Sequence, residues 1–390
     1  MKTENVVTGM MSALLACTGG AILIVQSSHH LGLDRTELVS WMFAVYVIGG
    51  LLNFLLSLRY RIPFGGAHSI TVAAFLSTAA VQFPWPELAG SFIMAGVLLA
   101  LLGVTGLFGK VLEYIPKQLM DAMLAGLILS YAVALIPSMK EAPIVGGMAV
   151  LGFFLAPRVS RAIPPIFGVV VFAVLGLVVS NEMPQLPPAE FVVPQLVMPS
   201  FTVRGFLSVT IPCAVLVLSN DVAVALTALK KNGFDAPVNR TLLITGLTSA
   251  FAGFFGGHAT NIGGMMSALC SSEEAGPKEK RYKAAMVSGL LVALFGLFAW
   301  KLGVVIQALP MSFIRIITGF SLVGVLLGSL QSSFSDASYR YSVLFSFIVA
   351  ISNVSFLGVS AAVWSLVAGA AAAKLLGEGK AKEKERVPTQ

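Results

Sequence analysis

Charged residues are scarce in this sequence. Asp, Glu, Lys and Arg make up 11% of its 390 residues, whereas hydrophobic residues make up 57%. The mean hydropathy is +0.89, and uncharged apolar runs near the roughly 20 residues needed to cross a bilayer recur from end to end. This composition excludes a soluble domain with a large core and indicates a protein with many membrane-spanning segments.

Cysteine and histidine are also rare, with three and four residues respectively. All three cysteines lie within or at the end of apolar runs, where a free cysteine behaves as a small hydrophobic residue, so no disulfide framework is implied. The sequence contains no G-x-x-x-x-G-K nucleotide loop and no H-E-x-x-H zinc motif, and it has too few histidines and cysteines for a metal cluster. We therefore expect neither an enzyme nor a bound cofactor, and any transport would be driven by an ion gradient.

The apolar runs predict fourteen membrane-spanning segments. They cover residues 6–26, 38–58, 62–83, 88–109, 115–137, 143–157, 164–180, 203–228, 239–255, 256–272, 283–305, 309–331, 339–353 and 355–376. Between the seventh and eighth segments, the stretch from Asn181 to Pro199 is too rich in proline to be helical, and we expect it to lie outside the cell. No room remains for a separate soluble domain.

The positive charges indicate how the chain is oriented. Most of the 25 Lys and Arg residues fall on the side of the membrane that holds the N-terminus. The opposite side keeps Arg35, Lys140, Arg204, Lys301 and Arg315. By the positive-inside rule, both termini of this multi-pass cell-membrane protein are predicted to be cytoplasmic. The net charge of +7 is explained by this orientation and implies no nucleic-acid partner.

The two halves of the chain share a distinctive interruption. Phe64-Gly65-Gly66-Ala67-His68-Ser69 in the third segment matches Phe255-Gly256-Gly257-His258-Ala259-Thr260-Asn261 in the tenth, apart from one inserted residue. Because each half holds an odd number of segments, the second half must be inverted in the membrane relative to the first. We therefore predict an inverted repeat of residues 1–190 and 191–390.

The two Phe-Gly-Gly-His interruptions cannot be helical throughout. Only 32 uncharged residues lie between Arg240 and Glu273, and two crossings must fit into them. As helix they would span roughly 48 Å, short of the roughly 60 Å that two passes require. Extended backbone supplies the missing length, and because lipid offers no hydrogen bonds, we expect the interruptions to pair as short β-strands in segments three and ten. Each strand would lead into a half-helix, near Ile70 and near Ile262, whose N-terminus would attract a small anion such as a carboxylate.

Few ionisable groups lie inside the predicted segments. Asp221 is the one acidic residue well inside a segment, and His68 and His258 are the only histidines there. Because a charge inside the bilayer is energetically costly, we expect Asp221 to face protein or water and to carry a proton, unless it is a structural residue that ties two helices together. Each histidine could couple protonation to anion binding or simply fix the strands. Thr260 and Asn261 could donate hydrogen bonds to the anion, but they are also suitable helix caps.

The segment from Phe255 to Asn261, followed by Ala268-Leu269-Cys270 and the acidic pair Glu273-Glu274, resembles the signature of the benzoate/proton symporter (BenE) family. The stretch from Ser57 to Pro63, before the third segment, and Leu357-Gly358 to Trp364, in the last segment, are also similar to that family. The resemblance runs along nearly the whole chain.

This resemblance implies an all-α integral membrane protein with the fold of uracil permeases and sulfate permeases, built from seven plus seven inverted segments. It implies a core domain of residues 1–110 plus 200–305, and a gate domain of residues 111–190 plus 306–376. Proteins of this fold are typically homodimers that work by an elevator-like motion, so we expect a homodimer here. Carried over position by position, the substrate region falls on the starts of segments three and ten and on the eighth segment, at Gly66, His68, Ser69, Asn220, Gly257, His258, Thr260 and Asn261.

Together these features predict a symporter, driven by the proton gradient, that imports benzoate or a related small aromatic carboxylate through the lipid bilayer. Asp221 or His258 would carry the proton, and His68 is a further candidate. Two alternatives within transport stay open: a nucleobase/proton symporter of the same fold, and an uncoupled transporter of inorganic or organic anions. An intramembrane enzyme would need a catalytic pair, for which only Asp221 and the two histidines are available.

Overall fold

The computed structural model describes residues 3–79, 82–108, 110, 116–159, 163–186, 188–357 and 359–379, and the regular structure of this part is helical. Gly358, named above in the family pattern, lies outside it. The helices of the first half are α1 (Thr3–Leu31), α2 (Arg35–Phe43), the π-helix η1 (Ala44–Ile48), α3 (Gly49–Tyr60), α4 (Ile70–Ala79), α5 (Trp85–Thr105), α7 (Lys117–Glu141), α8 (Pro143–Val159) and α9 (Pro165–Val179). Those of the second half are α10 (Val203–Gly205), the π-helix η2 (Phe206–Thr210), α11 (Ile211–Leu216), the π-helix η3 (Val217–Val222), α12 (Ala223–Lys231), α13 (Val238–Gly253), α14 (Gly264–Ser271), the 3-10 helices η4 (Glu273–Ala275) and η5 (Lys278–Lys280), α15 (Tyr282–Leu297), α16 (Ala299–Ala308), α17 (Met311–Ser333), the 3-10 helix η6 (Ala337–Tyr339), α18 (Arg340–Ser352) and α19 (Ala361–Leu376).

Local sequence sets where several helices begin and end. Asp34 starts α2 through a capping box, in which its Oδ1 accepts from the Glu37 backbone N–H at 2.8 Å while the Glu37 side chain accepts from the Asp34 N–H at 2.9 Å. Pro84 precedes α5, and Gly106 ends that helix in the left-handed conformation. The Pro-rich stretch between α9 and α10 is not helical in its described residues, which confirms that prediction.

The chain is not helical at either glycine-rich interruption. α4 begins at Ile70, as predicted, and α14 begins at Gly264, close to the predicted start. With 10 and 8 residues, these helices span about 15 Å and 12 Å, roughly half of a bilayer core. The predicted short β-strands in segments three and ten are not confirmed. The described residues contain no strand, and the two segments pair at one isolated antiparallel bridge, between His68 and Thr260. Away from α4 the same pairing continues only through backbone hydrogen bonds from Asn261 to Ala67 and from Gly263 to Gly65, which do not amount to a strand.

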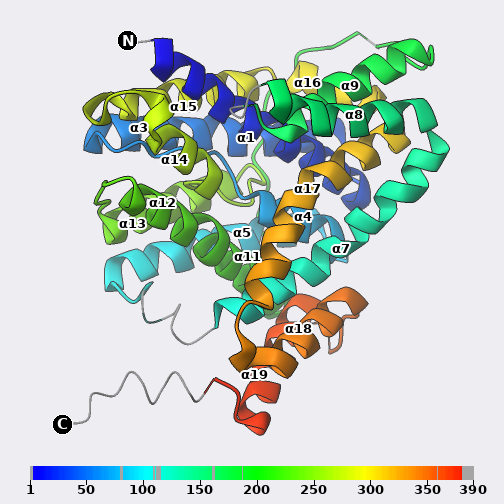
Figure 1. Cartoon of the computed structure of the whole chain (residues 1–390). Coiled ribbons are helices and arrows are strands. Elements are labelled where there is room, and N and C mark those ends of the chain that lie inside the picture. The colour runs from blue at the N-terminus through cyan, green and yellow to red at the C-terminus, as the bar shows by residue number, and fades with distance from the viewer. Residues whose placement is uncertain are drawn as a thin grey trace.

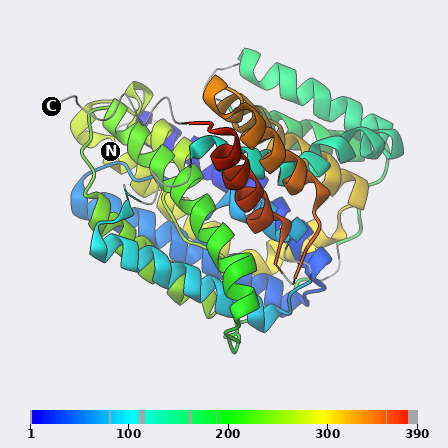
Figure 2. The ribbon, with the colours of Figure 1, turned by 90° about the horizontal axis from the view of Figure 1, so that it is seen from below.

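The helices pack in two groups that lie side by side (Figures 1 and 2). In the first group, α1 and α3 pack on α15, α5 packs on α13, α4 packs on α1, and α14 packs on α12. In the second group, α7 packs on α17 and α18, α8 packs on α9, and α18 packs on α19. The groups meet where α1 contacts α9 and α17 and where α4 contacts α7. Both half-helices therefore belong to the first group, and α4 lies at its boundary with the second.

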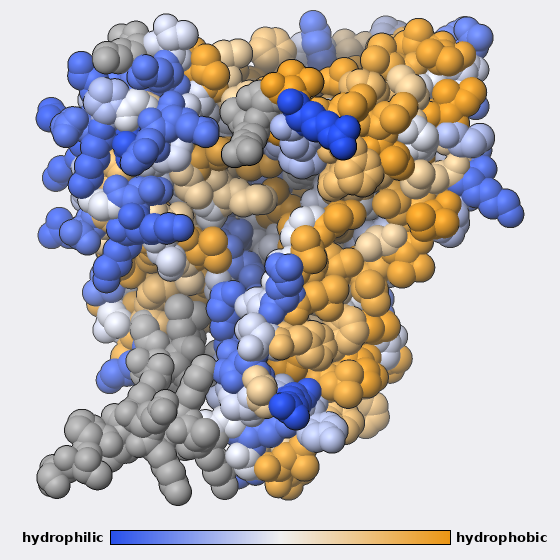
Figure 3. Space-filling model, viewed as in Figure 1, coloured by the Kyte–Doolittle hydropathy of each residue, from blue (hydrophilic) through white to orange (hydrophobic). Residues whose placement is uncertain are grey.

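The surface is that of a membrane protein. Figure 3 shows hydrophilic residues gathered on the side where α3, α12, α13 and α14 lie, whereas hydrophobic residues cover the part formed by α7, α8, α9 and α17. A bilayer, not water, suits such an exposed apolar surface. Within the described ranges, six helices, or seven if the bent pair α15 and α16 is counted as one span, are long and apolar enough to cross a membrane. Helix occurs in each of the fourteen predicted segments, but the number of crossings stays a prediction.

Glycine allows the two interruptions to approach closely. A Cβ on Gly66 would lie 2.4 Å from the backbone oxygen of Asn261 and 2.6 Å from the backbone nitrogen of Gly263. A Cβ on Gly65 would lie 2.6 Å from the carbonyl carbon of Met266. These neighbours are backbone atoms, which cannot rotate away as the end of a side chain can. The crossing therefore requires glycine at both positions.

Replacement of Gly66 by Ala should destabilise the protein, because overpacking an interior position typically costs about 1–3 kcal/mol. Gly147 is the matched control, since it lies within α8 and a Cβ there would meet no atom within 4 Å. Gly147→Ala should keep or slightly raise stability, because Ala favours helix over Gly. The measurement is the melting temperature of the purified protein in detergent. An unchanged melting temperature for Gly66→Ala would contradict the close crossing.

Candidate functional site

The two interruptions cross and bind each other in the interior of the first helix group. The Asn261 N–H donates to the Ala67 carbonyl at 3.1 Å, and the Gly263 N–H donates to the Gly65 carbonyl at 2.8 Å. The Gly65 oxygen also accepts from the Ser267 hydroxyl at 2.9 Å. These bonds pair backbone groups that lipid could not satisfy. They also bring the beginnings of α4 and α14 together.

His258 is fixed on both sides of its ring. The Trp41 indole N–H, which can only donate, lies 2.9 Å from Nδ1, so Nδ1 must be the acceptor. The proton of the neutral ring is then on Nε2, which donates to the Ser69 carbonyl at 3.0 Å. His258 is 1% exposed. A second proton on Nδ1 would displace the indole donor, so this geometry suits a residue that positions the crossing better than one that exchanges protons.

His68 lies beside His258, with the two ring centroids 5.1 Å apart and the planes at 83°. Its Nε2 is 3.1 Å from the Tyr46 hydroxyl, and the Tyr46 ring packs edge-on against the imidazole. Tyr46 belongs to η1, and π-helical turns often occur at functional sites. A Cβ on Gly20 of α1 would lie 2.5 Å from the His68 Nε2. The ring therefore occupies a close-fitting space between α1 and η1.

Thr260 and Ser69, two of the predicted substrate contacts, are also engaged with protein. The Thr260 N–H donates to the Ser249 hydroxyl at 3.0 Å, and its own hydroxyl donates to Thr248 on α13 at 3.0 Å. The Ser69 hydroxyl accepts from the Val72 N–H at 3.2 Å, so Ser69 caps the start of α4. The Thr260 hydroxyl thus faces α13, whereas Ser69 stays at the N-terminus of a half-helix.

Asn261 and Asp221 keep unused hydrogen-bonding capacity. The backbone oxygen of Asn261 accepts from the Asn53 side chain at 3.0 Å, but neither polar atom of its own buried amide has a partner of normal geometry among the described residues. Asp221 lies in η3, is 8% exposed, and faces the side chains of Ser69 and Asn261. Its Oδ2 is buried without a partner of normal geometry in the same part of the chain. Buried polar groups are normally paired, so an orphaned cluster of this kind indicates a place for a ligand.

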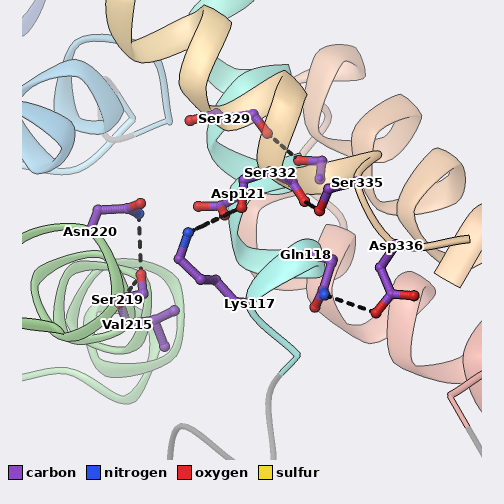
Figure 4. A network of polar contacts seen from close by, with 11 residues as sticks. Lys117, Gln118, Asp121, Val215, Ser219, Asn220, Ser329, Ser332, Ser335 and Asp336 are labelled. Carbon is purple, nitrogen blue, oxygen red and sulfur yellow. Dashed lines mark hydrogen bonds and ion pairs between the residues drawn. The ribbon is translucent and has the colours of Figure 1, made fainter. Parts of the chain in front are cut away.

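Asn220 has a different environment from its neighbour Asp221. It is half-buried, and its amide nitrogen donates to the Ser219 hydroxyl at 3.1 Å. Figure 4 shows it on the side of η3 that faces α7 and α17. There the Lys117 ammonium donates to Asp121 at 2.8 Å and to Ser332 at 3.1 Å. Asn220 therefore faces the boundary with the second helix group.

The structure thus separates the predicted site residues by their surroundings. Ser69, Asp221 and Asn261 form one cluster, which we call the orphan cluster because the Asn261 amide and Asp221 Oδ2 have no partner of normal geometry. His258 bonds the Ser69 carbonyl of this cluster, and His68 lies beside His258. Gly66 and Gly257 allow close packing, since a Cβ on Gly257 would lie 2.8 Å from the Ala44 methyl carbon. Sequence reasoning missed Trp41, Tyr46 and Asn53, which hold the histidines and Asn261 in place. In the sequence, these three residues are marked only by a polar atom within an apolar run, and many residues packed in the interior share that feature.

The model of the family described as "BenE: Benzoate membrane transport protein" matches residues 1–375. The chain belongs to the BenE family. This BenE-family protein is 30% identical over 370 residues to the "Inner membrane protein YdcO" of Escherichia coli (strain K12), with 94% of each chain covered. It is 24% identical over 380 residues to the "Benzoate membrane transport protein" of Acinetobacter baylyi, covering 96% of this chain and 95% of that one. It is a membrane transporter and not an enzyme.

Two solved structures share the fold of this BenE chain. SLC26A9 aligns with a TM-score of 0.66 at 14% identity and covers 95% of this chain, which spans 65% of the SLC26A9 chain. The transmembrane domain of a cyanobacterium bicarbonate transporter, BicA, aligns with a TM-score of 0.61 at 15% identity, covering 95% of this chain and 98% of that domain. At these identities the likeness establishes the fold alone.

Replacement of Trp41 by Phe should lower the melting temperature of the BenE protein. It leaves the buried Nδ1 of His258 without its donor, and an unsatisfied buried polar group costs about 1–3 kcal/mol. Trp364→Phe is the control, because Trp364 also donates its indole N–H, to the Phe356 carbonyl at 3.0 Å, but Phe356 is 58% exposed and the loss leaves no fully buried group without a partner. Equal melting temperatures for the two variants would contradict the fixing role of Trp41.

Proposed function

We propose that this protein is a proton-coupled symporter that imports benzoate or a related small aromatic carboxylate. The observation that carries the proposal is the orphan cluster of Ser69, Asp221 and Asn261, placed at the N-termini of two half-helices. Membership of the BenE family and the likeness to the Acinetobacter benzoate membrane transport protein support the choice of substrate.

In this proposal the substrate carboxylate binds between the starts of α4 and α14. Helix N-termini present N–H groups and partial positive charge, which favour an anion. The amide nitrogen of Asn261, which has no partner of normal geometry, donates to one carboxylate oxygen. The Ser69 hydroxyl, which lies 3.0 Å from the Thr71 hydroxyl in the structure, turns to donate to the other. The anion would thereby complete the hydrogen bonds that the protein leaves open.

Asp221 carries the proton in this mechanism. Two carboxylates side by side in a buried site repel each other, so substrate binding requires that Asp221 be neutral. A protonated Asp221 also donates a hydrogen bond, which its buried Oδ2 does not form in the structure. Proton and anion therefore bind together, and the loaded site is neutral, which lowers the cost of moving it through the membrane. His258 is left with a positioning role, because both of its ring nitrogens are already bonded.

The elevator motion would move one helix group past the other. The packing of the helices into two groups supports a core domain of residues 1–110 plus 200–305, and a gate domain of residues 111–190 plus 306–376. The pair of half-helices in equivalent places supports the inverted repeat of residues 1–190 and 191–390. We further propose a homodimer of fourteen-span subunits in the inner membrane, with both termini cytoplasmic. An anion transporter without proton coupling is the second candidate, because the similar BicA domain belongs to a bicarbonate transporter.

The test is uptake of labelled benzoate into proteoliposomes with an imposed inward proton gradient. Asp221→Asn should abolish gradient-driven uptake, because Asn cannot exchange the proton, while benzoate should still raise the melting temperature of the purified variant. Asp121→Asn is the control, since Asp121 is also a buried carboxyl, at 2% exposure, but bonds Lys117 and Ser332 away from the orphan cluster.

Full proton-driven uptake by Asp221→Asn would remove Asp221 from the mechanism. A panel of hydroxybenzoates, short aliphatic carboxylates, uracil, xanthine, sulfate and bicarbonate tests the substrate in the same assay. Uptake of bicarbonate or sulfate at a rate that does not depend on the proton gradient would favour the second candidate, an anion transporter without proton coupling.

A further inference from the structure

An apolar groove lies on the outer side of the first helix group, between α3 and α13. Its volume is about 420 Å³, and its walls include Leu51, Leu55 and Phe251. These three side chains are 45%, 57% and 57% exposed, so the groove opens onto the outer surface of the protein. Oxygen and nitrogen atoms contribute very little of its lining.

One end of this groove is positively charged. Arg59, in the last turn of α3, lines it together with Tyr60, and the guanidinium lies 5.6 Å from the centre of the Tyr60 ring. Arg240 lies one helical turn before the lining residue Ile244, on the same face of α13. Both arginines are exposed, and neither forms an ion pair with a described carboxylate.

We propose that the groove holds an acyl chain of an anionic phospholipid whose phosphate binds Arg59 and Arg240. The apolar walls suit a hydrocarbon chain, and the two unpaired cations suit a phosphate, which a guanidinium can bind through two parallel hydrogen bonds. Arginines near helix ends reach the headgroup layer while their stems stay in apolar surroundings. Basic pockets between helices are a recurring way of binding anionic lipid.

Such a lipid would sit directly behind the crossing of the two interruptions. Thr248, on the groove wall, accepts the hydrogen bond from the Thr260 hydroxyl at 3.0 Å. The lipid would thus tie α3, from the first half of the chain, to α13, from the second, at the level of Thr260. This inference does not depend on which substrate the protein carries.

The test uses delipidated full-length protein in detergent and measures the melting temperature against added lipid. Long-chain phosphatidylglycerol should raise it with dose, and by more than phosphatidylcholine of the same chain length. Arg59→Gln should lose most of this difference, whereas Arg59→Lys should keep part of it because the charge remains. Arg158→Gln is the control, since Arg158 is an exposed arginine in the last turn of α8, outside the groove.

Two further probes separate a lipid from a free anion. Inorganic phosphate and short-chain dihexanoyl phosphatidylglycerol carry the charge without a chain that fills the groove. The proposal is overturned if either raises the melting temperature as much as the long-chain lipid does. It is also overturned if phosphatidylcholine matches phosphatidylglycerol, or if Arg59→Gln keeps the full difference between them.

Discussion

The need to pair every backbone polar group at membrane depth governs this structure. A helix meets that need alone, but an extended segment in lipid does not. Here two non-helical segments meet it by crossing, with the N–H groups of Asn261 and Gly263, just before α14, bonded to the carbonyls of Ala67 and Gly65. Side chains complete the arrangement, as when His258 donates to Ser69 and Asn53 donates to Asn261. The positions of the half-helices, and of every polar group between them, follow from this pairing.

The orphan cluster lies among residues that bond mainly to the protein itself. Thr260, His258 and the backbone of Asn261 all form hydrogen bonds within the protein. They therefore stabilise the crossing and keep few hydrogen-bonding groups free for a ligand. The Asn261 amide and Asp221 Oδ2 face each other but have no partner of normal hydrogen-bond geometry. Recognition of a small anion is favoured by a few open hydrogen-bonding groups held in a fixed frame, because these groups then lose little conformational freedom on binding.

The sequence predicted the features that depend on local chemistry. Glycine pairs mark where helix gives way to extended chain, so the break before Ile70 and the start of α4 could be placed closely. The predicted strands are not confirmed, because strand pairing depends on how two segments far apart in the sequence align, which composition does not show. Trp41 and Asn53 were missed for another reason: their partners lie 217 and 208 residues away in the chain, and neither residue belongs to a motif. Asn220 and Asp221 point to different surroundings because consecutive residues of a helix do not face each other, but which side each one faces is set by packing against other segments.

The crossing also has a consequence for biosynthesis. The Gly65 carbonyl accepts a hydrogen bond from Ser267, which is synthesised 202 residues later. The Ser69 carbonyl accepts one from His258, which is synthesised 189 residues later. At about 5–20 residues per second, the ribosome needs roughly 10–40 s to supply these partners. During that interval the first interruption has carbonyls that lipid cannot satisfy, so it must remain in contact with water or with the insertion machinery. The first half of the chain therefore cannot complete its interior alone, and final assembly in the membrane begins only after α14 has been made.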